Sequence, residues 1–183
     1  MKIVQAGMQH LDGVLGLHKR YHISSIDAAD KPGGFVTTNF IPEQLSALVE
    51  KEHGITIAMD GDDIIAYAMA ASWQFWSEWA LFAHMIEKLP ENTFHGQMLS
   101  VDNSYQYGPI CIDRQYRSSG LFQKVFFASL AAMADRYSTM VTFINRINGR
   151  SCTAHTKKAG MDVVCEFQFN QNNYYMLACP TKF

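Results

Sequence analysis

The spacing of apolar residues along the first 71 positions predicts helices that alternate with strands. Apolar residues three to four positions apart mark two helices, whereas two β-rich runs around Asp60-Gly61-Asp62-Asp63 mark a hairpin. Between the helices, Pro32-Gly33-Gly34 breaks the pattern and predicts a loop. The expected elements are a strand at 1–5, a helix at 10–22, a loop at 24–39, a helix from Pro42 that ends at Gly54, and strands at 55–59 and 64–71.

The second part of the chain resumes this alternation after an aromatic stretch. Phe75, Trp79 and Phe82 have the i, i+4, i+7 spacing of one helical face, and Pro90 closes the stretch. A further helix at 119–136 would turn inward the apolar residues Phe122, Val125, Phe126, Leu130 and Met133. The other expected elements are a helix at 73–89, an irregular or partly extended segment at 93–106, strands at 107–112 and 140–144, a helix at 149–159, and antiparallel strands at 163–169 and 174–179.

This order of elements predicts one layered α/β (α+β) domain over residues 1–183. Hairpins next to crossover units favour a mixed, mostly antiparallel central sheet flanked by helices. The aromatic stretch would form an insertion at about 73–106, and all three tryptophans lie in its first seven residues.

Composition and charge exclude several classes of protein. A net charge of −2 without any basic run argues against a nucleic-acid partner. The longest apolar runs are too short for a membrane helix, which needs about 20 residues. The four cysteines include no CxxC pair, and without a secretion signal we expect reduced thiols and a cytoplasmic location. His18 and His22 have a spacing that can hold zinc, but no third ligand is patterned, so we expect no metal.

The most informative segment is Ile110–Phe122, in which an apolar strand leads into a polar turn and a helix. Small residues at Ser118-Ser119-Gly120 would let a phosphate approach the exposed N–H groups at the helix start. The turn therefore predicts a pyrophosphate site, with an ordinary serine-capped turn as the alternative. The motifs GxxxxGK[ST], GxGxxG, GxSxG and HExxH are absent.

This segment resembles the acyl-CoA-binding motif [QR]-x-x-G-x-[GA] of the GNAT superfamily of N-acetyltransferases. Arg117 and Gly120 match the motif, and Phe122 stands where the family has Gly or Ala. A downstream segment is similar to the family's N-x-x-[AS]-x-x-x-Y. Asn148 and Ser151 match it, whereas His155 takes the place of the tyrosine.

The resemblance implies acetyl-CoA as the acyl donor. Backbone groups of the strand would contact the pantetheine arm, and N–H groups of the turn would hold the pyrophosphate. The implied CoA-binding residues are Ile110, Cys111, Ile112, Arg117, Ser118, Ser119, Gly120, Leu121, Phe122, Gln123 and Asn148. Asn148 also suits a helix N-cap. The Cys111 side chain would pack in the core rather than act as a nucleophile.

The implied reaction is direct transfer of an acetyl group to a primary amine. His155 would act as general acid for the departing thiolate, with simple packing or capping as the alternative. Phe143 stands where many relatives have a glutamate base. The base would therefore come from Glu78, Asp102, Tyr105 or ordered water.

The aromatic stretch would build the acceptor pocket in such an enzyme, from Trp76 and Trp79 with Tyr105 and Tyr107 near the floor. The alternative is that these rings pack in the core or between two subunits of a homodimer. The sequence thus predicts a cytoplasmic N-acetyltransferase for a small-molecule or peptide amine, without a nucleic-acid or membrane partner. The rival interpretation is a catalytically inactive CoA-binding sensor or interaction module on the same fold.

Overall fold

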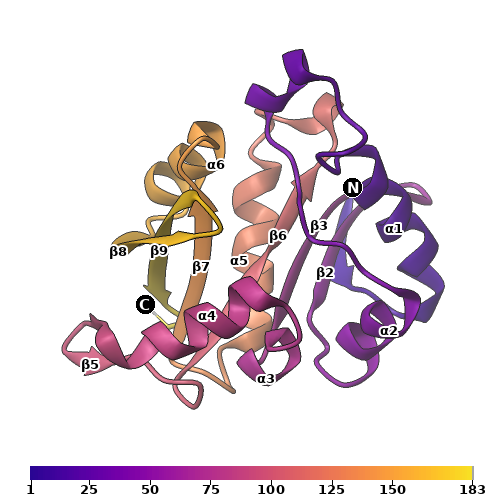
Figure 1. Cartoon of the computed structure of the whole chain (residues 1–183). Helices are drawn as coiled ribbons and strands as arrows, with labels where there is room; N and C mark the ends of the chain where they lie inside the picture. The colour runs from indigo at the N-terminus through magenta and orange to yellow at the C-terminus, as the bar shows by residue number, and fades with distance from the viewer. Residues whose placement is uncertain (183) are drawn as a thin grey trace. The chain divides into compact units, whose positions relative to one another are not determined.

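The computed structural model describes residues 1–182, which form two compact units (Figure 1). Unit 1 comprises residues 1–70 and 108–132, and unit 2 comprises residues 71–107 and the chain from 133 onward. The long strand β6 (Ser104–Ile112) contributes its first half to unit 2 and its second half to unit 1.

Unit 1 is built on antiparallel strands. Strand β2 pairs with β1 on one side and β3 on the other, and β6 is the next strand in order. In Figure 1 the helices α1 and α2 lie beside β2 and β3. The elements of unit 1 are β1 (Lys2–Gln5), α1 (Leu11–Arg20), α2 (Pro42–Glu50), β2 (Ile55–Asp60), β3 (Asp63–Ala71) and α5 (Leu121–Met133), with short 3₁₀ turns at Met8–His10, Ala28–Gly33 and Arg114–Tyr116.

In unit 2, strands β6 and β7 pair in parallel. The first residues of β6 run parallel to β7, from the pair Ser104 and Thr139 to the pair Gln106 and Val141, and β9 and β8 follow in antiparallel order. The elements of unit 2 are α3 (Trp73–Trp76), α4 (Ala80–Lys88), a 3₁₀ turn at Leu89–Glu91, β4 (Thr93–Phe94), β5 (Gln97–Met98), β7 (Thr139–Asn145), α6 (Gly149–Thr153), a π-helical turn at Ala154–Lys158, β8 (Asp162–Phe169) and β9 (Asn172–Pro180).

The predicted fold class is confirmed, because the sheet is mixed, mostly antiparallel and flanked by helices. The apolar patterns also placed most elements within a few residues of their observed bounds. Of the inward residues predicted for α5, Val125, Phe126, Leu130 and Met133 are buried, and Phe122 is half-buried.

The single helix predicted at 73–89 is wrong, because the chain forms two helices there. Ser72 caps α3 by accepting the N–H of Phe75 at 3.2 Å, and Trp79 adopts an extended backbone before α4 starts. The indoles of Trp73 and Trp76 donate to Ser104 and Gln106 of β6. Because these bonds tie a single turn to the strand, α3 stops before the aromatic stripe is complete. No helix within residues 1–182 has the length and apolar character needed to cross a membrane.

Candidate functional site

The turn between β6 and α5, residues 113–120, is shaped by its own side chains. Asp113 Oδ1 accepts the N–H of Gln115 at 3.1 Å, and the Ser119 hydroxyl donates to the Tyr116 carbonyl at 2.6 Å. Arg117 Nε donates to the carbonyl of Ile112, the last residue of β6, at 2.9 Å. Contacts inside unit 1 therefore hold this turn in a defined conformation.

The backbone of this turn suits close approach by an anion. Ser118 and Gly120 both have positive φ, at 69° and 80°, and α5 begins at the next residue. The first N–H groups of an α-helix have no carbonyl partner within the helix, and they carry the positive end of its dipole. A Cβ at position 120 would meet no heavy atom within 4 Å, so the space beside the backbone is open. These features fit the phosphates of a CoA donor.

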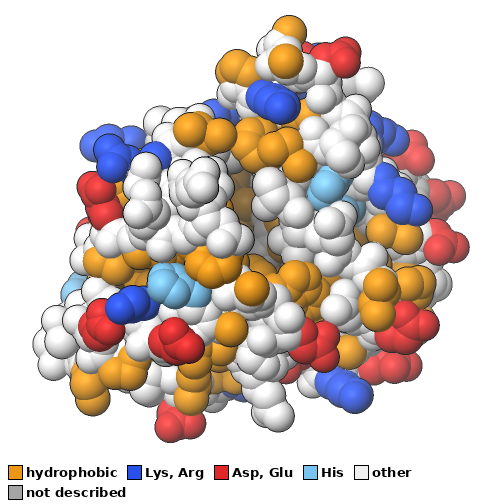
Figure 2. Space-filling model, viewed as in Figure 1, with side chains coloured by type: hydrophobic (Ala, Val, Ile, Leu, Met, Phe, Trp, Pro, Cys, Tyr) orange, Lys and Arg blue, Asp and Glu red, His pale blue; other side chains and the backbone are white. Residues whose placement is uncertain are grey.

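Basic side chains surround the turn. Arg114 forms an ion pair with Asp30, Arg20 pairs with Asp113 at 2.5 Å, and Lys124 is exposed on the first turn of α5. Elsewhere on unit 1, acidic and basic side chains intermingle over α1 and α2 (Figure 2). The face seen there has no large field of one sign that would steer a charged acceptor.

Cys111 is a core residue, as the sequence predicts. Its side chain is 4% exposed, and burial raises the pKa of the thiol to about 12. A protonated thiol is a poor nucleophile, so the geometry gives no support to a covalent acyl-cysteine step. Ile110 and Ile112 on either side are half-buried, so this part of β6 offers backbone rather than side-chain chemistry.

Two further residues that the resemblance implies for CoA binding lie at the start of α5. Leu121 is buried, and Gln123 is exposed. The ring of Phe122 is half-buried and lies 5.9 Å from the ring of Phe126, one turn further along the helix. This contact supports the interpretation that Phe122 packs along α5.

In unit 2, Asn148 caps helix α6. Its side-chain oxygen accepts the N–H of Ser151 at 3.2 Å, which confirms the N-cap that its position suggests. The additional contact with the CoA arm stays a prediction. Asn148 lies between the C-terminal end of β7 and the start of α6.

His155 is buried within the π-helical turn that follows α6. Its Nδ1 lies 2.8 Å from the Ser151 carbonyl, and a carbonyl only accepts, so Nδ1 carries the proton and Nε2 carries a lone pair. Burial lowers the pKa of His155 to about 4. The ring is 5.9 Å from that of Tyr107, in an edge-to-face arrangement. The general-acid role stays a prediction, and it requires a protonated form that burial opposes.

Of the predicted base candidates, Glu78 and Asp102 are exposed, whereas Tyr105 is as buried as His155. Glu78 lies between α3 and α4, and Asp102 lies two residues before β6. Phe143 is half-buried, with its ring 5.4 Å from Phe82 and 5.6 Å from Tyr174. Both acidic candidates stay predictions.

The tryptophans divide into buried anchors and a half-buried neighbour. Trp76 is fully buried, and its indole donates to the Gln106 carbonyl at 3.2 Å, whereas Trp79 is half-buried. Tyr105 and Tyr107 are also fully buried, and burial raises the pKa of both phenols well above its usual value. These contacts favour the packing alternative, and the acceptor pocket stays a prediction.

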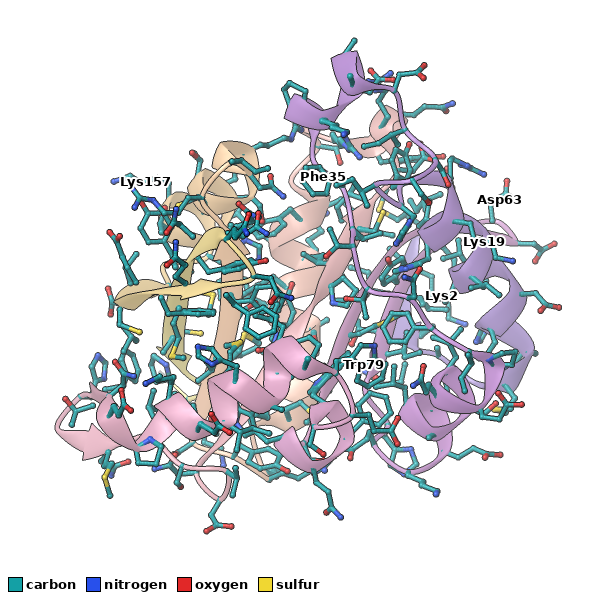
Figure 3. The ribbon with its side chains drawn as sticks, viewed as in Figure 1. Lys2, Lys19, Phe35, Asp63, Trp79 and Lys157 are labelled. Carbon is teal, nitrogen blue, oxygen red and sulfur yellow. The ribbon has the colours of Figure 1, made fainter. Side chains whose placement is uncertain are left out.

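His18 on α1 and His22, which lies beyond the end of that helix, have a role that their spacing did not reveal. His18 accepts the Tyr67 hydroxyl at Nδ1 and donates through Nε2 to the Thr38 carbonyl, at 2.6 and 2.7 Å. His22 Nε2 donates to the Thr37 carbonyl at 3.2 Å. Both imidazoles therefore fasten the chain that leads into α2, while Lys19 between them points outward (Figure 3). No cluster of three metal-ligating side chains occurs within residues 1–182.

Comparisons with known proteins agree with this fold. No protein-family model matches the sequence, and no curated protein matches it either. Among solved structures, a ribosomal-protein-S18-alanine N-acetyltransferase from Escherichia coli is similar with a TM-score of 0.63 at 10% identity, over 100% of this chain and 94% of that one. A putative acetyltransferase from Salmonella typhimurium with its cofactor acetyl-CoA reaches 0.64 at 12% identity, over 99% and 94%.

A third similar structure is an acetyltransferase of the GNAT family from Streptococcus pneumoniae, with a TM-score of 0.63 at 10% identity over 98% of both chains. Identities this low establish a shared fold and leave the activity open. The resemblance to the GNAT superfamily is therefore confirmed at the level of the fold.

Proposed function

We propose that this protein is an acyl-CoA-dependent N-acetyltransferase that moves an acetyl group from acetyl-CoA to a primary amine. The observation that carries the proposal is the turn at 113–120, which opens α5 with two residues of positive φ and open space at Gly120. A protein with the same fold, solved with its cofactor acetyl-CoA, supports this proposal.

Two parts of unit 1 would hold the donor. The backbone of Ile110–Ile112 would hydrogen-bond the pantetheine arm, and the N–H groups of residues 117–123 would bind the pyrophosphate. Acetyl-CoA supplies the activated acyl group as a thioester.

The reaction proceeds by attack of the amine nitrogen on the thioester carbonyl. A C–N bond forms, the C–S bond breaks, the amine loses a proton, and the CoA thiolate gains one. With a pKa of about 4, only about one His155 ring in a thousand is protonated at pH 7. We therefore propose that proton removal from the amine runs through Glu78, Asp102 or ordered water, and that His155 donates to the thiolate only if donor binding raises its pKa.

The acceptor is a small-molecule or peptide amine. The Escherichia coli structure carries the name of an enzyme that acetylates an alanine of ribosomal protein S18, so peptides with a free N-terminus belong in any acceptor panel. The mixed charges on the visible face of unit 1 favour no strongly charged acceptor.

Two measurements test this proposal. Calorimetry with acetyl-CoA should show saturable binding, and absence of binding would exclude both the enzyme and a CoA-binding sensor. Thiol release should then be followed across amines, amino acids and peptides. An enzyme releases thiol only when an acceptor is present, whereas a sensor binds CoA and releases none with any amine.

A further inference from the structure

The segment between α1 and α2 forms a loop whose ends meet. The N–H of Ile23 donates to the Val36 carbonyl at 2.9 Å, and the N–H of Val36 donates to the Tyr21 carbonyl at 3.0 Å. Loops of 6 to 16 residues with adjacent ends are compact and frequently functional. We call residues 23–36 the strap, and Figure 1 shows it at the top of the view beside the turn that precedes α5.

Two arginines of that turn hold the strap. Arg117 Nη1 donates to the Gly33 carbonyl at 2.6 Å, and Arg114 pairs with Asp30. The Arg117 guanidinium also lies over the ring of Tyr21, at the base of the strap, 4.8 Å from its centroid. The strap therefore rests on the segment that opens α5.

The same Arg117 side chain holds the turn. Its Nε donates to the Ile112 carbonyl, so one planar guanidinium spans a carbonyl at the end of β6 and a carbonyl of the strap. A lysine carries a single ammonium group and lacks this fixed fork, so it cannot reproduce both bonds. Movement of the turn is thereby transmitted to Gly33.

We propose that Arg117 is a positioning residue that couples the strap to the donor turn, so that CoA binding and ordering of the strap are one event. This inference rests on the proposed function, because it takes the turn to be the donor site. The strap then forms one wall of that site. Thermodynamic linkage requires that CoA stabilise the ordered strap by the same factor by which ordering of the strap tightens CoA binding.

The chain that follows the strap is attached separately. His18 and His22 hold the carbonyls of Thr38 and Thr37, and neither bond involves Arg117. Loss of the arginine should therefore loosen residues 28–34 and leave residues 36–38 in place. This spatial restriction separates loss of the coupling from general destabilisation.

Hydrogen exchange of backbone amides, with and without CoA, tests the coupling in wild type, Arg117→Lys and a matched control. Arg136→Lys is the control, because Arg136 also lies over a tyrosine ring, that of Tyr137, within unit 2. In Arg117→Lys the amides of 28–34 should exchange about 10-fold faster, and CoA should bind about 10-fold more weakly. CoA should slow exchange of the strap in wild type and in the control.

Equal exchange of residues 28–34 in wild type and Arg117→Lys would overturn the coupling. If wild type binds no CoA, the proposed function fails, yet the comparison of strap exchange without ligand still tests the tether. Asp30→Ala provides a second route, since it removes the pair with Arg114 and keeps Arg117 intact. It should speed strap exchange and weaken CoA binding less than Arg117→Lys, and unchanged exchange in both variants would rule out the tether.

Discussion

The turn at 113–120 in unit 1 and the aromatic cluster of unit 2, by which we mean Trp76, Trp79, Tyr107 and His155, use their candidate residues in opposite ways. In the turn, half-exposed side chains such as Arg117 and exposed ones such as Ser119 bond to backbone carbonyls, and little apolar surface is buried. In the cluster, Trp76, Tyr107 and His155 are almost completely buried. A substitution in the turn should therefore alter ligand binding first, whereas one in the cluster should alter the free energy of unfolding first.

Replacing a buried tryptophan should have the largest effect. Trp76→Ala removes a fully buried ring and its bond to the Gln106 carbonyl, and should lower the free energy of unfolding by about 4 kcal/mol. Trp79→Ala removes a half-buried ring and should lower it by about 2 kcal/mol. Urea unfolding followed by circular dichroism measures both values.

The same pair of variants separates packing from an acceptor pocket. If the cluster packs, Trp79→Ala keeps the acceptor KM of wild type under conditions where it is folded. An increase in acceptor KM without loss of stability would instead support the pocket. Trp76→Phe is the control for the indole N–H, and should lose about 1 kcal/mol beyond its smaller ring.

His155 should make stability depend on pH in one direction. Its folded pKa of about 4 lies below the unfolded value of 6.5, so the unfolded chain binds the extra proton. The stabilisation is complete above about pH 6.5 and is lost as the pH falls toward 4, by up to about 3 kcal/mol. Urea midpoints measured between pH 7.5 and 4.5 give the slope.

His155→Gln is the matched variant, because glutamine retains a donor but does not titrate. Its stability should fall less steeply over this pH range, whatever its value at pH 7.5. Identical slopes in the two proteins would show that His155 is not the group responsible. The interpretation of His155 as a buried, neutral imidazole would then have to be abandoned, together with the proposal that donor binding protonates it.

Gly120→Ala should show the opposite balance, with an effect on the ligand larger than on the fold. At a φ of 80° an alanine is strained by about 1 kcal/mol, and the added methyl group points into open space. If phosphates occupy that space, CoA affinity should fall by 10-fold or more. Gly16→Ala is the control, because its Cβ also meets nothing within 4 Å but lies within helix α1. It should raise stability slightly and leave CoA binding unchanged.

The strand, turn and helix around residues 113–120 could be predicted from sequence because their signals are local. A strand that ends in small residues, followed by an apolar helical face, needs no information from elsewhere in the chain. The helix break at 77–79 could not be found in this way. It depends on the Trp76 indole reaching the Gln106 carbonyl, 30 residues away.

The attachment of the strap was beyond sequence reasoning for the same reason. Arg117 and Gly33 are 84 positions apart, and the acceptor is a backbone carbonyl, which leaves no trace in residue type. The His18 and His22 pair shows the reverse problem. Its spacing suggests one helical face, but α1 ends before His22, and two carbonyls accept the imidazole N–H groups.

The smallest effect should come from the ion pair at the start of the turn. Arg20 is 63% exposed and Asp113 only 11%, so the attraction is screened by solvent on one side. Arg20→Gln should lower the free energy of unfolding by less than about 0.5 kcal/mol, and added salt should abolish the difference. Asp113→Ala should lower it more, because it also removes Asp113 Oδ1, which accepts the N–H of Gln115 inside the turn. Equal losses would mean that the ion pair, rather than this cap, holds the turn. An exposed partner would then contribute as much to the stability of the turn as the less exposed one.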